Sequence, residues 1–245
     1  MVKTQIKSYI KIGKKVYKGS PTETLIDDLV NDLGGTATVL VINAIKLVDD
    51  TDTERDSENI YTTDWSFTIL TNGYRGACSK TISITADYNV AKIRLYASDR
   101  LYFEYVLSTP EAVQSGGQFK VDITIDVTVS LSHTGGTLVS ITGENVLGEF
   151  ILKRFTNGDY RGNSIDKLCI YYQSIQQTCL STTINIDTAN NKVTITVTYT
   201  PTSDINMDEY RWNNSTANID VVVVKIEAVT LSANVQHSWT LTIQF

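Results

Sequence analysis

Alternating apolar and polar positions predict β-strands along most of the chain. In residues 119–131 every odd-numbered position is apolar and every even-numbered one is polar, and residues 193–199 repeat this two-residue period. Such runs are typical of half-buried strands in antiparallel sandwiches, where one face meets the core and the other meets water. Thr, Val, Ile and Tyr dominate after residue 35, and all four favour strands. The pattern therefore predicts an all-β fold.

One segment, residues 21–33, has helical spacing instead. Ser20 is placed to cap the helix, Pro21 occupies its first position, and Glu23 completes a capping box. Gly34–Gly35 ends the helix. The apolar residues on its predicted buried face are Leu25, Ile26, Leu29, Val30 and Leu33. We therefore predict one short N-terminal helix.

The residues before this helix alternate imperfectly over 2–12, which predicts a strand or an extended arm. The segment is basic, with lysines at Lys3, Lys7, Lys11, Lys14, Lys15 and Lys18. A basic arm suits an acidic neighbour, an inner membrane leaflet or packaged nucleic acid. Residues 1–33 are therefore interpreted as an N-terminal basic arm followed by an amphipathic helix.

Four short segments recur later in the chain in the same order. The matches are Gly34–Thr36 with Gly135–Thr137, Thr71–Gly76 with Thr156–Gly162, Thr81–Ile84 with Thr183–Ile186, and Val129–Ser132 with Val229–Ser232. The offsets are 101, 85, 102 and 100 residues (135 − 34, 156 − 71, 183 − 81 and 229 − 129). Three nearly equal offsets indicate a duplication. Insertions at 49–59 and 165–180 explain the deviating one, because loops tolerate insertions.

The duplication predicts two tandem antiparallel β-sandwich units, residues 34–134 and 135–245. The strand order does not follow from the pattern, so jelly-roll and immunoglobulin-like topologies both remain open.

Composition narrows the function classes. The net charge is −6 over 245 residues, which argues against a nucleic-acid-wrapping surface and against sequence-specific nucleic-acid binding. No signal-like apolar region follows Met1, and no apolar run approaches the length of a transmembrane segment. We therefore expect a protein made in a host cytoplasm that leaves, if it leaves, by another route, such as release inside a virus particle.

The reactive residues form no recognisable catalytic or metal motif. Cys78, Cys169 and Cys179 are odd in number, which favours three buried thiols, although a Cys169–Cys179 bridge across a hairpin stays open. His133 and His237 lie in no metal spacing, and the chain has no Gly-x-Ser-x-Gly element. We expect no enzymatic activity and no cofactor.

Six acidic residues crowd the segment 49–58. Calcium prefers such oxygen clusters, but the central Gly and terminal Glu of an EF-hand loop are missing. A solvated acidic loop is the favoured interpretation, with a calcium site as the alternative.

Two aromatic–arginine pairs are candidate contact points. Tyr74 and Arg75 follow one Asn-Gly turn, and Tyr160 and Arg161 follow the other. A hairpin turn explains the same pattern if the tyrosine packs back on the sheet and the arginine pairs with a carboxylate. We favour this structural explanation, and keep equivalent partner contacts as the alternative.

A third candidate lies at residues 210–216, which read as a polar loop with aromatics. Tyr210 and Trp212 would suit a glycan there, and Asn213 and Asn214 begin two overlapping N-glycosylation sequons. Packing of these aromatics on the sandwich edge or in a subunit contact is the favoured alternative.

The layout of two tandem sandwiches over residues 34–245 resembles the double-jelly-roll structural proteins of archaeal and bacterial virions. The resemblance concerns architecture alone and implies a capsid or virion subunit that self-associates into a homo-oligomer or lattice and contacts other virion proteins. The two strand-like ends, residues 1–18 and His237–Phe245, would pair with a neighbour's sheet edge. The alternative is a carbohydrate-binding or adhesive β-sandwich at a cell surface.

Overall fold

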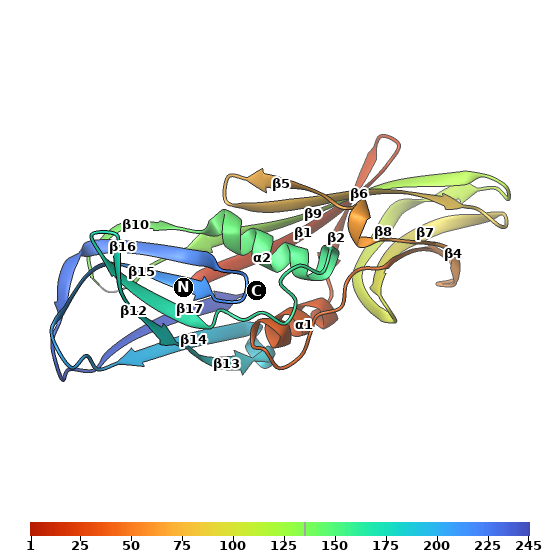
Figure 1. Cartoon of the computed structure of the whole chain (residues 1–245). Coiled ribbons are helices and arrows are strands. Elements are labelled where there is room, and N and C mark those ends of the chain that lie inside the picture. Colours follow the sequence, from red (N-terminus) through yellow and green to blue (C-terminus); the bar gives the residue numbers. More distant parts are fainter. Residues whose placement is uncertain (135) are drawn as a thin grey trace.

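The structure, a computed structural model, describes residues 1–134 and 136–245 (Figure 1). Strands account for 60% of the chain and helices for 12%. The strands form two sheets in which every pair is antiparallel except β1 with β17. The prediction of an all-β fold is therefore confirmed.

The strands divide unequally between the sheets. The twelve-stranded sheet contains β1 (Val2–Ile12), β2 (Lys15–Pro21), β3 (Ala44–Asp49), β4 (Glu54–Asn59), β5 (Ser66–Leu70), β6 (Gly73–Ser83), β7 (Tyr88–Ala97), β8 (Arg100–Val113), β9 (Gln118–Leu131), β13 (Thr183–Asp187), β14 (Lys192–Tyr199) and β17 (His237–Gln244). The five-stranded sheet contains β10 (Leu138–Thr142), β11 (Lys167–Tyr172), β12 (Ile175–Ser181), β15 (Ile205–Asn214) and β16 (Ile219–Leu231). The helices are α1 (Glu23–Leu33) and α2 (Glu144–Thr156), with 3₁₀ turns η1 (Thr62–Asp64) and η2 (Thr188–Asn190).

Strand β1 is the centre of the larger sheet. It pairs with β9 from Val2↔Leu131 to Lys11↔Asp122, forms a hairpin with β2, and runs parallel to β17 at Val2↔Ile243. One face of β1 is buried, because its even-numbered residues point into the core. The segment predicted as an arm is thus an internal strand of the larger sheet. The first and last strands of the chain, β1 and β17, pair with each other in this sheet.

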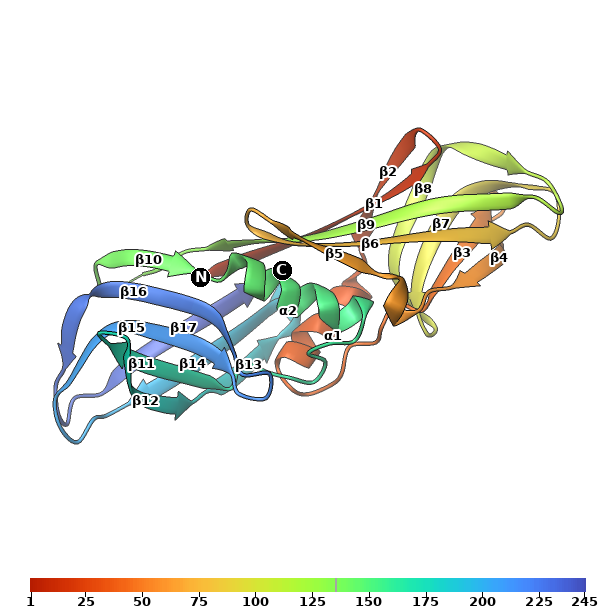
Figure 2. The ribbon, with the colours of Figure 1, turned by 45° about the horizontal axis from the view of Figure 1, so that its top comes forward.

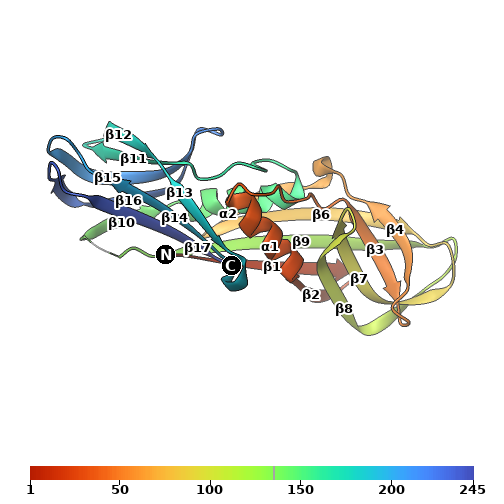
Figure 3. The same ribbon diagram turned by 90° about the horizontal axis from the view of Figure 1, so that it is seen from below.

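The molecule is elongated, and its two ends are built differently (Figure 2). At one end, the path β2-β8-β7-β3-β4 lies across from the long strands β1, β9 and β6. At the other end, the five-stranded sheet lies across from β13, β14 and β17. The long strands run between the two ends, with α1 and α2 near the middle (Figure 3).

The predicted units do not correspond to separate sheets. Residues 34–134 supply β3 to β9, residues 135–245 supply β10 to β17, and β1 joins β9 of the first set to β17 of the second. Gly135, which begins the predicted second unit and its Gly-Gly turn, lies outside the described residues. The division into tandem units, with boundaries at 33/34 and 134/135, stays a prediction.

Helix α1 lies within the predicted range but begins later. Thr22 is the N-cap, and its hydroxyl accepts a hydrogen bond from the backbone of Leu25 at 3.3 Å. Ser20 and Pro21 instead end β2, where they pair with Glu104 and Phe103 of β8. Sheet pairing therefore overrides the capping pattern at Ser20.

Helix α2 was not predicted, so the expectation of one helix is wrong. Its buried residues Leu147, Phe150, Ile151 and Phe155 follow the spacing i, i+3, i+4, i+8, and α2 packs on β6 and β9. The helix also overturns one repeat match. Thr71–Gly76 leads into strand β6, whereas Thr156–Gly162 is the end of α2 and the loop after it.

Candidate interaction surfaces and an inter-sheet pocket

The two aromatic–arginine pairs occupy different structures. Arg75 on β6 forms a two-point ion pair with Asp126 on β9, at 2.6 Å from Nε to Oδ1 and 2.7 Å from Nη2 to Oδ2. Arg161 lies in the loop after α2, and its Nε donates to the carbonyl of Val39 at 2.7 Å. Both arginines therefore hold the fold together, and they are not equivalent contact points.

The two tyrosines of these pairs nevertheless converge on α2. Tyr74 stacks on Phe67 with ring centroids 6.0 Å apart, and Tyr160 packs on Phe150 at 5.2 Å. Burial raises the pKa of both hydroxyls, and the carboxylate of Glu149 acts in the same direction on each. Both are packing residues beside α2, half-buried rather than projecting into solvent.

Tyr210 and Trp212 lie on strand β15, not in a loop. Tyr210 is 7% and Trp212 2% exposed, because both side chains point from the five-stranded sheet toward the larger one. The register Tyr210↔Val224 and Trp212↔Val222 places them beside the apolar run of β16. Neither ring therefore forms a surface platform for a glycan.

The asparagines of the two sequons differ in accessibility. Asn213 is half-buried on the outer face of the sheet, and its Nδ2 donates to Asp220 at 3.0 Å. Asn214 is 1% exposed, and its oxygen accepts from the backbone of Ala217 at 2.6 Å while its Nδ2 donates to the carbonyl of Ser164. The amide of Asn214 is thus already engaged inside the fold.

A pocket of about 440 Å³ lies between β15 and β16 on one side and β17 on the other. The lining includes both histidines of the chain, His133 and His237. It also includes the aromatic residues Tyr210, Trp212 and Trp239. The hydroxyl of Tyr210 lies 3.0 Å from Nδ1 of His133, and burial raises the pKa of Tyr210 to about 12. The hydroxyl therefore keeps its proton at neutral pH.

The sequence could have indicated part of this pocket. Residues 237–243 alternate, so His237, Trp239 and Leu241 share one face of β17 with Ile243. The sequence does not show that His133 and His237 line the same pocket. The two residues are 104 positions apart (237 − 133), and this spacing carries no information on which sheets face each other.

The acidic segment runs from Asp49, the last residue of β3, through the following turn and into strand β4. Asp49 pairs with Arg55, Glu54 with Lys46, and Asp52 with Lys92 and Arg94. Across the described residues, no group of three or more His, Cys, Asp or Glu side chains is placed to hold a metal ion. These charges lie along the edge of the larger sheet, where charge discourages pairing with another chain.

Three of the other edge strands among the described residues lack such charges. In the part of the chain that the structure describes, β4, β5, β10, β12 and β13 each have one neighbouring strand. Strands β5, β10 and β12 contain no charged residue and no proline. Their exposed apolar side chains are Ile69 at 65%, Leu138 at 41%, Val139 at 64% and Ile175 at 67%.

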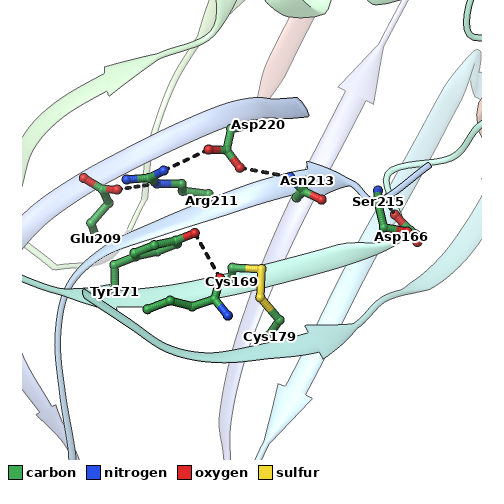
Figure 4. The surroundings of a disulfide bond; sticks show 10 residues. Asp166, Cys169, Tyr171, Cys179, Glu209, Arg211, Asn213, Ser215 and Asp220 are labelled. Atoms are coloured by element: carbon green, nitrogen blue, oxygen red, sulfur yellow. Dashed lines mark hydrogen bonds and ion pairs between the residues drawn. A yellow bond between two sulfur atoms is a disulfide. The ribbon is translucent and has the colours of Figure 1, made fainter. Parts of the chain in front are cut away.

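The charges of the five-stranded sheet lie instead on its outer face, beside a disulfide (Figure 4). Arg211 pairs with Glu209 and, at 2.9 Å, with Asp220, and its guanidinium lies 4.0 Å from the ring centre of Tyr171. Cys169 of β11 and Cys179 of β12 are bonded, and Cys78 is a buried free thiol. The prediction of three thiols is therefore wrong, because the antiparallel register places Cys169 opposite Cys179.

No protein-family model, no curated protein and no solved structure matches the chain. Within residues 1–134 and 136–245, no helix has the length and apolar character needed to cross a membrane.

Proposed function

We propose that this protein is a structural subunit that assembles by pairing its uncharged sheet edges with those of other copies. The observation that carries the proposal is the distribution of charge over the edge strands. Strand β4 holds Glu54, Arg55, Asp56 and Glu58, whereas β5, β10 and β12 hold none. Edges without charge that expose β-branched side chains are templates for strand addition.

Strand β12 is the best prepared of these edges. The Cα atoms of Cys169 and Cys179 are 4.0 Å apart, which is typical of a non-hydrogen-bonded antiparallel pair. In such a pair the backbone N–H and C=O of Cys179 point away from β11, toward the open edge. The disulfide fixes β12 to β11, so a neighbouring strand meets an edge that is already ordered.

The setting that we propose is a virion, with a cell surface as the alternative. The Cys169–Cys179 disulfide supports both, because disulfides persist at virion and cell surfaces and are rare in the cytosol. A relation to tandem jelly-roll virion proteins belongs to the same proposal and rests on the all-β two-sheet architecture. The proposal does not include pairing of free terminal strands with a neighbour's sheet edge, because β1 and β17 pair with each other within the chain.

The carbohydrate-binding alternative loses its main support. It required Tyr210 and Trp212 as a surface platform, and both rings face the interior at 7% and 2% exposure.

The test compares assembly of edge variants with that of the parent chain. Ile175→Lys on β12, Val139→Lys on β10 and Ile69→Lys on β5 each place an ammonium on an open edge. The matched control is Val235→Lys, which adds the same charge at an exposed apolar position in a turn. We expect at least one edge variant to shift the particle distribution toward monomer while the control assembles like the parent. Equal assembly of the parent, the control and all three edge variants would refute the proposal.

A further inference from the structure

The hairpin formed by β1 and β2 is strongly basic. Residues 1–22 contain no Asp and no Glu. The lysines of this segment are all exposed or half-buried, and they are Lys3, Lys7, Lys11, Lys14, Lys15 and Lys18. The tip of the hairpin projects from the body of the molecule (Figure 1). Its positive charge is therefore presented to solvent.

Most of these lysines share the outer face of the larger sheet. The lysines of β1 alternate with its buried residues and so point away from the core. The register Tyr9↔Lys18 places Lys18 on the same face. The outward-facing charges of β1, β2, β6 and β9 are the cations Lys3, Lys7, Lys11, Lys18, Arg75 and Lys120 and the carboxylates Asp122 and Asp126. This face thus has a formal charge of +4 (6 − 2), and the rest of the chain has −10 (−6 − 4).

The two carboxylates on this face are engaged by other partners, although the register places them opposite two lysines of β1. Asp126 forms the two-point ion pair with Arg75. Asp122 accepts a hydrogen bond from the hydroxyl of Ser79 at 2.7 Å and lies 3.5 Å from the ammonium of Lys120. Within the described part of the chain, no ion pair is formed by Lys3, Lys7, Lys11, Lys14 or Lys18. Their charge is available to an anionic partner.

An exposed apolar side chain lies among these lysines. Val16 is 63% exposed, and the register places it beside Lys11 on the outer face of the hairpin. Lys15 precedes it, and Lys18 follows on the same face of β2. The hairpin therefore offers cations and an apolar group to the same partner.

This combination suits an anionic bilayer better than a nucleic acid. Lysines are attracted to anionic head groups, and an apolar side chain beside them can enter the boundary between head groups and acyl chains. A nucleic acid offers no apolar phase to Val16. Proteins that bind single strands also present exposed aromatic rings to the bases. The hairpin does not, because Tyr9 is half-buried and Tyr17 is 7% exposed.

We propose that the β1–β2 hairpin and the outer face of β1 dock this protein on an anionic lipid bilayer. The lysines lie against the lipid phosphates, and Val16 enters the head-group boundary. At physiological salt, charges farther from the membrane than the Debye length of about 8 Å are largely screened, so a projecting hairpin limits the repulsion of the acidic remainder. The inference goes beyond assembly and does not rest on it, because the hairpin contains none of the edge strands β5, β10 and β12.

The test measures flotation of the full-length protein with vesicles of phosphatidylcholine in which phosphatidylglycerol is about one third of the lipid. We expect binding that is lost on phosphatidylcholine alone and at about 1 M salt, where the Debye length is about 3 Å. Lys14→Gln/Lys18→Gln should lower the partition coefficient roughly 30-fold, because each lysine near such a surface contributes about fivefold. Lys167→Gln/Lys225→Gln removes the same charge from the five-stranded sheet, and this matched control should bind like the parent.

A second readout reports the position of the hairpin tip. The emission of Val16→Trp should shift to shorter wavelength when the anionic vesicles are added. Val235→Trp, at an exposed turn position, is the matched control and should show no shift. Circular dichroism verifies that each variant is folded, and if the lysine variant is misfolded, the emission of Val16→Trp carries the test.

Three results with the vesicles would overturn the proposal. They are failure of the parent to bind the anionic vesicles, equal binding by the parent and folded Lys14→Gln/Lys18→Gln, and an unshifted emission of Val16→Trp. Tighter binding of a fluorescent single-stranded or duplex oligonucleotide than of the vesicles would also overturn it, and would identify this face as a nucleic-acid surface.

Discussion

Asp32 on α1 and Arg154 on α2 form an ion pair in which both side chains are fully buried, although 122 residues separate them in the chain. Oδ1 of the same carboxylate accepts hydrogen bonds from the backbone of Gly162 at 2.8 Å and of Val39 at 3.1 Å. The guanidinium also lies over the ring of Phe150, 4.2 Å from its centre. Burial lowers the pKa of Arg154 to about 10, which leaves it charged at neutral pH.

Removing one partner of this pair should cost far more than removing an exposed pair. Arg154→Met leaves the Asp32 carboxylate buried without a counter-charge, so we expect a loss of about 3–5 kcal/mol in the free energy of unfolding. Urea denaturation measures it. The neighbouring pair Lys153–Glu149 is partly exposed, and Lys153→Met is the control, with a loss of roughly 0–1 kcal/mol.

The double variant Asp32→Asn/Arg154→Met separates charge burial from packing. Asn keeps an oxygen for the amides of Val39 and Gly162 but carries no charge, so the double variant should be more stable than Arg154→Met alone. A double variant less stable than the single one would contradict this explanation.

The cysteines give a direct count of the disulfide. Burial raises the pKa of Cys78 to about 11, so its thiolate is scarce at pH 8 and the folded protein should not react with a thiol reagent such as Ellman's reagent. The denatured, unreduced chain should show one reactive thiol, and the reduced chain three. Three thiols before reduction would show that Cys169 and Cys179 are not bonded.

Gly148 of α2 lies directly on Gly73 of β6. A Cβ at position 148 would lie 3.0 Å from the Cα of Gly73 and from the backbone nitrogen of Tyr74. Gly148→Ala should therefore destabilise the fold by about 1–3 kcal/mol, although Ala is the better helix former by about 1 kcal/mol. Thermal and urea unfolding report the sign, and Glu149→Ala on the same helix is the control. A net stabilisation by Gly148→Ala would show that α2 is free to move away from β6.

The strands could be predicted from the sequence because their alternation is local. Strand β9 covers the alternating residues 119–131, and β14 covers 193–199. The sequence predicts strands throughout the chain after residue 35, because Thr, Val, Ile and Tyr dominate there, and it therefore does not indicate helix α2. Neither the pairing of β1 with β17 nor the burial of Arg154 against Asp32 has a local pattern, because both depend on which distant segments meet.

The contacts of the candidate site residues also depend on distant segments that the sequence does not bring together. Arg75 pairs with a carboxylate, as the favoured structural explanation requires, but its partner Asp126 lies 51 residues away on β9, so the sequence does not identify that partner. Asn213 and Asn214, which follow Trp212, predict a polar loop at this position. Its ring is buried because β15 is a central strand of its sheet, between β11 and β16.

Sedimentation velocity of the parent chain over a wide concentration range tests assembly most directly, and it should be repeated at several salt concentrations and pH values. The uncharged edges of β5, β10 and β12 predict species larger than the 27.2 kDa chain, growing with concentration and shifted toward monomer by a lysine on the responsible edge. A single 27.2 kDa species under every condition would contradict the proposal that this protein is an assembly subunit.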